Sequence, residues 1–402
     1  MQFRDPKKKS VSNIIINIAI LAVSIGIAII IIAISTGKGL QEKIKTKTIA
    51  FNGHISITPF ENNESQISIL PFDDNLDLRK LIKKNGDINI INSIVFDGVI
   101  LKNKNDFEGA LFKGVDINYN WEVIKEFIVE GTFPSFSKKK ISNEIVLSKS
   151  IANKLSLKLN DNIELYFQNS RNNNLPYRSR SKIVGLFYSG FPEIDNNLIY
   201  GDINQIRRIK KWDENKIGGY EIFVNNIYDA ERLSEKIYSE LPSNLDSTSI
   251  TKRFNSIFQW IALFDFNILI ILIIVIIVSL INLSTALLIL IFERSKMISL
   301  LKTMGLKNKI IKKIFLWNGL FIIFKGLLIG NFFGIMFFLL QKKYSLIKLD
   351  PQTYFVDIAP VILNLKDVLF VNFLFVFLCI ILLWIPLNII LKISPSRVLR
   401  FR

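Results

Sequence analysis

The sequence predicts a membrane protein of the α+β class, with four transmembrane helices and a large α+β domain between the first two helices. Three observations support this fold class. Half of the 402 residues are apolar, and they concentrate in four long blocks. More than half of the chain separates the first block from the second, and basic residues gather beside one set of block ends. A membrane-spanning helix needs about 20 mostly apolar residues, and each block reaches that length.

The four blocks define the expected domain organisation. The first block is expected to stay in the protein, because its apolar stretch is longer than the core of a signal peptide and no clean cleavage site follows. The predicted order is a cytoplasmic tail (1–13), span one (14–34), an outer domain (36–264), span two (268–291), a cytoplasmic segment (292–313), span three (314–340), an outer loop (341–367), span four (368–391) and a cytoplasmic end (392–402).

The distribution of charge sets this orientation. The formal net charge is +17, and most of the excess lies in the N-terminal tail, in 292–313 and at the C-terminal end. The predicted outer domain is nearly balanced, with 31 basic and 28 acidic residues. Lysine and arginine favour the cytoplasmic side of a membrane protein. The excess therefore indicates topology, and no nucleic-acid partner is expected, because such a partner calls for a basic surface on the folded domain.

The segment 36–264 is too long for a loop and must fold in water. Alternating apolar residues predict seven strands, and helix signals predict four helices, two of them capped by Asp202 and Asp229. The predicted strands are His54–Thr58, Ile90–Lys102, Ala110–Val115, Glu144–Leu147, Asn162–Gln168, Lys182–Tyr188 and Tyr220–Asn225. The predicted helices are Leu76–Lys84, Lys149–Leu155, Asp202–Lys211 and Asp229–Leu241.

Residues that carry catalysis or bind metals are scarce. The chain has one histidine, His54, and one cysteine, Cys379, so neither a metal cluster nor a disulfide framework is expected. No phosphate-binding G-x-x-x-x-G-K-[ST] motif and no nucleophile elbow occur. The sequence predicts a protein that is not an enzyme and binds no cofactor, so the energy for any transport must come from another subunit.

The segment after the second span predicts a short amphipathic helix. Ile298, Leu301 and Met304 recur on one helical face, and Gly305 follows where a helix-ending glycine is expected. Such a helix suits a groove on a soluble subunit. The alternative is a basic loop that lies on anionic lipid.

The third span contains a small-residue face. Gly326, Gly330 and Gly334 are four residues apart, which aligns them and allows close helix packing. Lys325 lies within the same apolar run, where a charge is costly unless it is paired or reaches the interface.

A polar stretch, Gln168–Lys182, joins two predicted strands. One interpretation is a disordered hairpin loop. The other is a projecting loop that grips a protein partner, because exposed arginine and tyrosine suit such contacts. The candidate contact residues are Arg171, Leu175, Pro176, Tyr177 and Arg178.

Longer motifs resemble a known family. FERSKMISLLKTMGLKNKIIKKIFLWNGLFIIFKGLLIGNFFG, which starts at Phe292, and the terminal SPSRVLRFR resemble FtsX/MacB-type ABC transporter permeases. GLFYSGFPEIDNNLIYGDI, LSKSIANKLSLKLNDNIELYF and KLDPQTYFVDIAPVIL resemble the lipoprotein-releasing LolC/LolE family. One departure is Met297, which stands where the superfamily usually has a glutamate, although Glu293 is kept.

The resemblance implies a multi-pass subunit of the bacterial inner membrane whose large domain is a MacB-like periplasmic core. It implies a cytoplasmic ABC ATPase dimer that binds ATP, a second permease subunit (identical or different), a lipoprotein substrate taken from membrane lipid and a periplasmic carrier. Glu293, Ile298, Leu301, Met304 and Gly305 would couple to the ATPase, and the Gln168–Lys182 loop would bind the carrier. The alternatives are MacB-like efflux and FtsX-like signalling that activates a cell-wall hydrolase.

Overall fold

The computed structural model describes residues 11–388, except 64, 87, 105, 139 and 169–175. These residues fall into two compact units. The helical unit contains the start of α1, residues 261–348 and the chain from Ile358 onward. The sheet domain contains Lys43–Trp260 and the short segment Leu349–Asp357.

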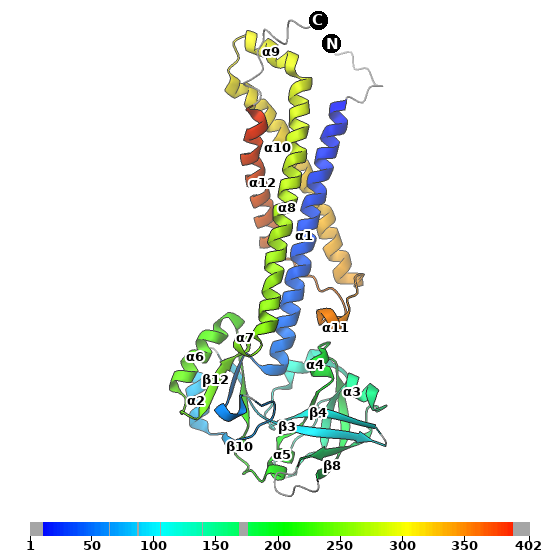
Figure 1. The fold of residues 1–402 in the computed structure, drawn as a ribbon, viewed down its shortest axis with the longest axis vertical. Helices are drawn as coiled ribbons and strands as arrows, with labels where there is room; N and C mark the ends of the chain where they lie inside the picture. The colour runs from blue at the N-terminus through cyan, green and yellow to red at the C-terminus, as the bar shows by residue number, and fades with distance from the viewer. Residues whose placement is uncertain are drawn as a thin grey trace. The chain divides into compact units, whose positions relative to one another are not determined.

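The helical unit is built from long apolar helices (Figure 1). These are α1 (Val11–Asn52), α8 (Asn255–Glu293), α10 (Asn308–Tyr344) and α12 (Leu365–Leu387), with the short α9 (Ser295–Thr303) between α8 and α10. In the described residues, α1, α8 and α10 are long and apolar enough to cross a membrane. The fourth predicted span falls on α12, which has 23 residues and is not among those three, so the number of spans stays a prediction.

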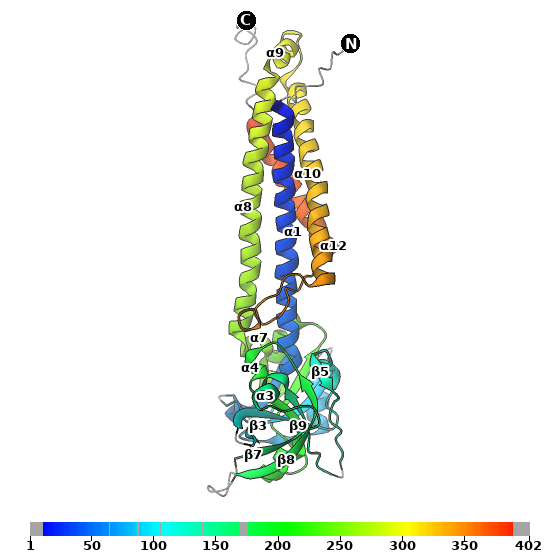
Figure 2. The same ribbon diagram turned by 90° about the vertical axis from the view of Figure 1, so that its right-hand side faces the viewer.

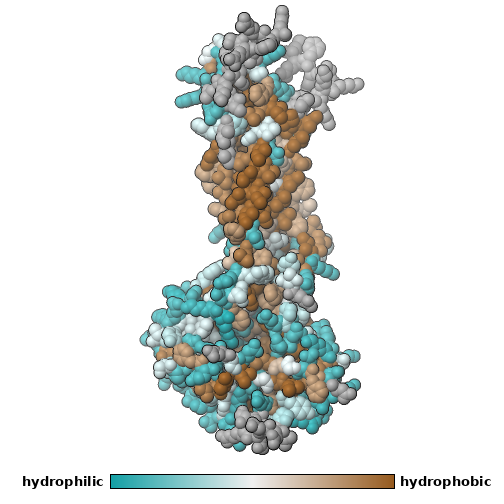
Figure 3. All heavy atoms as spheres, in the orientation of Figure 1, coloured by the Kyte–Doolittle hydropathy of each residue, from teal (hydrophilic) through white to brown (hydrophobic). Residues whose placement is uncertain are grey.

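The ends of these helices group together. Figures 1 and 2 place α9 at the same end of the helical unit as the start of α1 and the end of α12. Figure 3 shows apolar side chains over most of the helical unit and polar ones near the α9 end. A surface that is apolar along its length is expected when the surrounding solvent is lipid.

Two helices extend well beyond the predicted spans. The first span was predicted to end at Ile34, but α1 continues to Asn52. Likewise, α8 begins at Asn255, before the predicted start at Ile268. Both extensions carry buried apolar residues, among them Ile44, Phe51 and Ile261, so packing continues the helix after the uninterrupted apolar run has ended.

The sheet domain contains a ten-stranded sheet in the order β12-β1-β11-β3-β4-β9-β6-β8-β5, with β7 paired to both β3 and β8. Its strands are β1 (Ile55–Pro59), β3 (Ile88–Asn103), β4 (Asp106–Val115), β5 (Ile128–Gly131), β6 (Glu144–Ser148), β7 (Asn162–Phe167), β8 (Tyr177–Phe187), β9 (Leu198–Asp202), β11 (Gly219–Val224) and β12 (Leu245–Ser249). A small second sheet pairs β2 (Phe72–Asp73) with β10 (Lys216–Ile217).

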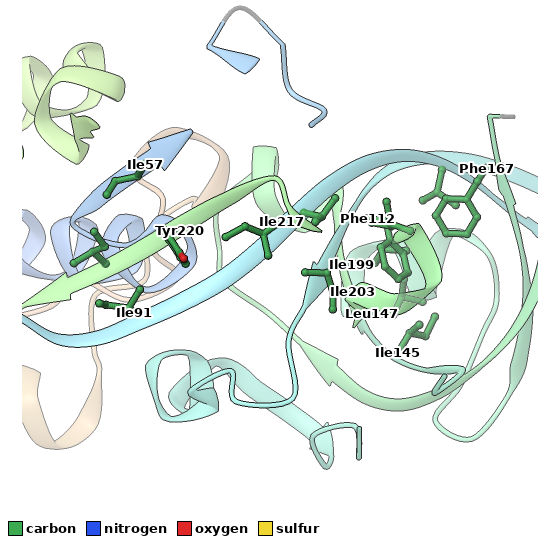
Figure 4. Close-up of a cluster of buried hydrophobic side chains, with 14 of the residues drawn as sticks. Ile57, Ile91, Phe112, Ile145, Leu147, Phe167, Ile199, Ile203, Ile217 and Tyr220 are labelled. Carbon is green, nitrogen blue, oxygen red and sulfur yellow. The ribbon is translucent and has the colours of Figure 1, made fainter. Parts of the chain in front are cut away.

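The pairings divide this domain into two lobes that share β3. Strands β3, β4, β9, β6, β8 and β7 pair in a closed ring, because β7 returns to β3. The first half of β3 continues into the β11-β1-β12 sheet. Figure 4 shows the core running through both lobes, from Ile57 and Tyr220 to Phe112 and Phe167.

Short helices complete the domain. They are α2 (Leu76–Lys84), α3 (Lys149–Lys154), α4 (Pro192–Asp195), α5 (Ile203–Lys210), α6 (Ala230–Glu240), α7 (Ile250–Arg253) and α11 (Pro351–Tyr354). The 3-10 helices are Phe60–Asn62, Trp121–Phe127 and Ile227–Asp229.

One of the two predicted helix caps forms, and the other does not. Asp202 caps α5 as predicted, because its carboxylate accepts a hydrogen bond from the Asn204 backbone N at 2.9 Å. Asp229 occupies the N-cap position of α6 but makes no side-chain cap hydrogen bond there. The side chain of Asn226, three residues earlier, accepts from the Tyr228 backbone N instead and starts the preceding 3-10 turn.

Candidate coupling and partner sites

Helix α9 follows α8 almost without a break and ends in a Schellman turn. The Leu306 backbone N donates to the Leu301 carbonyl at 3.0 Å, and the Gly305 backbone N donates to the Lys302 carbonyl at 3.1 Å. Gly305 has a φ of +84°, which an L side chain rarely adopts. The glycine therefore ends the helix at the position that the sequence predicted.

The apolar residues of α9 point in two directions. Ile298 is 0% exposed and packs in a cluster with Ile291, Ile311, Phe315 and Leu387. Leu301 packs partly against the same cluster. Ile298, predicted as a docking residue, is therefore a core residue of the helical unit.

A second apolar face of α9 is open. Met297, Leu300 and Met304 are 40%, 53% and 82% exposed, and their spacing places them on one side of the helix. Glu293, at the end of α8, is also exposed. The exposed apolar face of α9 therefore lies about one residue from the predicted face and keeps only Met304 of the three predicted apolar residues.

The glycine face of α10 lies against α1. A Cβ built on Gly326 would lie 2.5 Å from a Val23 methyl carbon. On Gly330 it would lie 2.6 Å from the Ser24 carbonyl oxygen, and on Gly334 it would lie 2.9 Å from the Ile31 Cβ. These separations leave no room for a methyl group, so the three glycines set the distance between the two helices.

A polar pair links α10 to α12. Asn331 donates from Nδ2 to the Asn372 side-chain oxygen at 3.0 Å, and Asn372 donates back at 2.9 Å. The Asn331 amide also donates to the Leu327 carbonyl at 2.7 Å. Satisfied amides between apolar helices fix their register.

The predicted partner loop, Gln168–Lys182, connects β7 to β8, but its candidate residues Tyr177 and Arg178 belong to strand β8, which begins five residues before the predicted start at Lys182. Its residues Arg171 and Leu175 lie outside the described residues. Phe167 pairs with Tyr177 across the hairpin. The Tyr177 ring lies 5.2 Å from the Arg208 guanidinium carbon, and Arg178 forms an ion pair with Glu164. The described end of the hairpin is therefore fixed by its own contacts.

Pro176 borders an open apolar face on the ring of strands. A hollow of about 740 Å³ is lined in part by Ile100, Phe107, Phe167 and Pro176. Ile100 and Phe107 are each more than half exposed.

A buried ion pair holds the end of α1 in the sheet domain. Lys113 Nζ lies 2.6 Å from Glu221 Oε1, and both side chains are almost fully buried. The same Nζ donates to the Phe51 carbonyl at 2.8 Å. That carbonyl belongs to the last turn of α1, where helical partners are missing, so Lys113 caps the helix. Burial lowers the pKa of Lys113, and Glu221 opposes this shift.

A second segment of the sheet domain comes from between α10 and α12. In Leu349–Asp357, the Phe355 ring stacks on Phe191 at 4.8 Å and meets Trp260 edge-on at 5.6 Å. Lys47 donates to the Phe355 carbonyl at 3.0 Å. Burial lowers the pKa of Lys47 to about 8. The sheet domain is therefore joined to the helical unit through α1, through α8 and through both ends of this segment.

Comparisons with known proteins match both parts of the chain. Residues 18–242 match the MacB-like periplasmic core domain family, and residues 269–395 match the FtsX-like permease C-terminal family. The chain belongs to the FtsX/MacB-type ABC transporter permeases.

The relatives of this permease carry more specific names. It is 26% identical to the lipoprotein-releasing system transmembrane protein LolC of Buchnera aphidicola subsp. Schizaphis graminum, over 98% of this chain and 96% of that protein. It is 24% identical to LolE of Haemophilus influenzae, over 80% of each chain. The solved periplasmic region of MacB from Actinobacillus actinomycetemcomitans is 15% identical and covers 53% of this chain and 95% of that one, with a TM-score of 0.34.

Three parts of the permease escaped the sequence analysis. The open α9 face was assigned one residue away, and the Lys113–Glu221 pair and the Leu349–Asp357 segment were not predicted as connections. The sequence signals for the pair were two lone charges, Lys113 in the predicted strand Ala110–Val115 and Glu221 in the predicted strand Tyr220–Asn225. Among the described residues no group of three or more His, Cys, Asp or Glu could hold a metal ion.

Proposed function

We propose that this permease is the transmembrane subunit of an ABC transporter that releases lipoproteins from the inner membrane to a periplasmic carrier. The observation that supports this best is the match to a lipoprotein-releasing transmembrane protein along 98% of the chain. In this proposal α12 is the fourth span. The α9 end and both termini face the cytoplasm, where the basic residues gather, and the sheet domain faces the periplasm.

The transport step needs energy from outside this chain. Each buried CH₂ of a lipid anchor contributes about 0.8 kcal/mol to membrane binding, so extraction of acyl chains is strongly unfavourable. ATP hydrolysis by a separate cytoplasmic ATPase dimer supplies that energy. The exposed Met297, Leu300 and Met304 of α9 form the surface that docks into the ATPase, as an amphipathic helix in a groove does.

Helix α1 carries the motion. It is continuous from the first span to Asn52, and its last turn is fixed by Lys113. Movement of the span passes to the sheet domain along this continuous helix. On the sheet domain, the β7–β8 hairpin with Pro176, Tyr177 and Arg178 meets the carrier. A second permease subunit, identical or different, completes the assembly.

The proposal is tested by reconstitution. The permease, its partner subunits and a fluorescent lipoprotein are placed in proteoliposomes, and transfer to soluble carrier is measured with and without ATP. ATP-dependent transfer that requires this chain is expected. ATP-driven efflux of peptides without lipoprotein transfer, or activation of a cell-wall hydrolase without any transport, would contradict it.

The docking surface has a separate test. Leu300→Asp places a charge on the open face of α9 and should abolish co-purification of the ATPase while membrane insertion is retained. Thr303→Asp adds the same charge to the same helix beyond the edge of that face and is the matched control. An ATPase complex that survives Leu300→Asp would show that α9 docks elsewhere.

A further inference from the structure

Lys325 lies in the apolar part of α10. Its side chain is exposed, although its neighbour Gly326 is buried against α1. The ammonium lies over the Phe321 ring, 4.4 Å from the centroid. No carboxylate oxygen lies within 4.0 Å of it in the part of the chain that the structure describes. A cation in hydrocarbon needs a stronger counter-charge than a ring face.

The surface around Lys325 suits lipid better than another helix. Trp317, Phe321, Leu328 and Phe332 lie on the same side of α10, and each is more than half exposed. Helices that pack together in membranes use small residues at the contact. On α10 the small residues lie on the other side, where Gly326, Gly330 and Gly334 meet α1.

The depth of Lys325 allows it to reach a headgroup. Trp317 is exposed, and tryptophan is typical of the membrane interface. From Leu320 to Leu340 the helix rises about 30 Å, the thickness of the hydrocarbon layer. Side chains on a helix point toward its N-terminus, and the Lys325 ammonium over Phe321 follows that rule. The charge therefore lies about one turn from Trp317.

We propose that Lys325 binds the phosphate of an anionic phospholipid in the leaflet on the α9 side of the membrane. The acyl chains of this lipid lie along Phe321, Leu328 and Phe332. Exposed lysines at the start of α10, Lys307, Lys309 and Lys313, add to the attraction for a net negative headgroup. The site requires only that α10 spans a bilayer, so it stands independently of the transported substrate.

The test measures lipid binding to the full-length permease by native mass spectrometry. Dioleoylphosphatidylglycerol and dioleoylphosphatidylcholine are titrated separately into the detergent-solubilised protein. The tightest phosphatidylglycerol should bind at least tenfold more tightly than phosphatidylcholine. Equal affinities for the two lipids would overturn the proposal, and this comparison needs no variant.

Variants locate the site. Lys325→Met should weaken the tightest phosphatidylglycerol binding at least tenfold, whereas Lys325→Arg should stay within about threefold because the charge is kept. Lys83→Met removes one exposed charge from the sheet domain and should leave lipid binding unchanged. Unchanged binding in Lys325→Met would place the lipid elsewhere. A carbodiimide cross-link from Lys325 to a carboxylate of another subunit would identify a protein partner and overturn the lipid assignment.

Discussion

The two units of this permease each place a lysine among apolar side chains, and they do so in opposite ways. In the sheet domain, Lys113 is fully buried and meets a carboxylate and a helix-end carbonyl. In the helical unit, Lys325 is on the outside and meets an aromatic ring. Water surrounds one unit and lipid the other, so the interior of the domain and the exterior of the helices are both apolar. In each place the charge needs a partner.

The two units also differ in how their side chains pack. Large aliphatic and aromatic side chains from several strands fill the core of the sheet domain. In the helical unit, α1 and α10 approach closely because the contact positions on α10 are glycines, which have no side chain. The hydrophobic effect drives the first kind of packing, while close backbone approach and van der Waals contact drive the second.

The largest loss of stability is expected when the buried Lys113–Glu221 ion pair is broken. Lys113→Met leaves the Glu221 carboxylate buried without its partner, which should destabilise the sheet domain by about 3–5 kcal/mol. The double change Lys113→Met/Glu221→Leu should recover most of that loss. Urea unfolding of the full-length protein followed by tryptophan fluorescence measures both, with Lys83→Met as the control. A loss below about 1 kcal/mol for the single change would show that the pair is not a structural anchor.

The next largest loss of stability is expected when a glycine at the contact between α1 and α10 is substituted. Gly330→Ala puts a methyl carbon 2.6 Å from the Ser24 carbonyl oxygen, a backbone atom that cannot easily move. Overpacking of this kind costs about 1–3 kcal/mol. Thermal unfolding in detergent measures the effect. Gly98→Ala, at a sheet-domain position with open space around the added carbon, is the control. Equal melting temperatures for the two variants would contradict the packing account.

His54 predicts a pH effect confined to the sheet domain. Burial lowers its pKa to about 4, and its Nδ1 accepts a hydrogen bond from the Val224 backbone N. In the unfolded chain His54 has its ordinary pKa of about 6.5, so the unfolded chain takes up a proton at a higher pH than the folded protein does. The stability that neutral His54 contributes is therefore lost as pH falls from about 6.5 toward 4. The loss between pH 7 and pH 5 should be on the order of 1–2 kcal/mol.

This contribution can be isolated because the chain has one histidine. His54→Gln should flatten the dependence of unfolding free energy on pH between 7 and 5 relative to the unsubstituted protein. Parallel curves for the two proteins would show that His54 does not titrate differently in the folded state.

The smallest effect is expected for the asparagine pair. A double-mutant cycle with Asn331→Ala and Asn372→Ala should give a coupling energy of about 0.6 kcal/mol and at most about 1.7 kcal/mol, the average and the maximum for hydrogen bonds between membrane helices. Additive losses, with no coupling, would mean that the two amides do not pair in the membrane.

Local signals in the sequence predicted the local structure well. Helix α2 has the predicted bounds, Gly305 ends α9, and the glycines of α10 lie on a packed face. Strands β2, β5, β9, β10 and β12 were missed. β12, with the sequence LDSTS, has one apolar residue and is held by its pairing with β1.

Contacts between residues that are far apart in the chain could not be predicted from the sequence. Lys113 and Glu221 are far apart in the chain, and no local pattern joins them. On α9 the pattern predicted an apolar face but not its direction, because apolar residues occur both on the buried side and on the exposed side of this helix. Ile298 faces the interior of the helical unit, and Leu300 lies on the exposed side of α9.

Accessibility from the two sides of the membrane tests the proposed topology of the permease. In a Cys379→Ser background, Lys83→Cys in the sheet domain and Met304→Cys on α9 are treated with a membrane-impermeant maleimide. In intact spheroplasts we expect labelling of Lys83→Cys alone, with Met304→Cys labelled only after lysis. Labelling of both positions from the same side would contradict a permease that joins a cytoplasmic motor to a periplasmic domain.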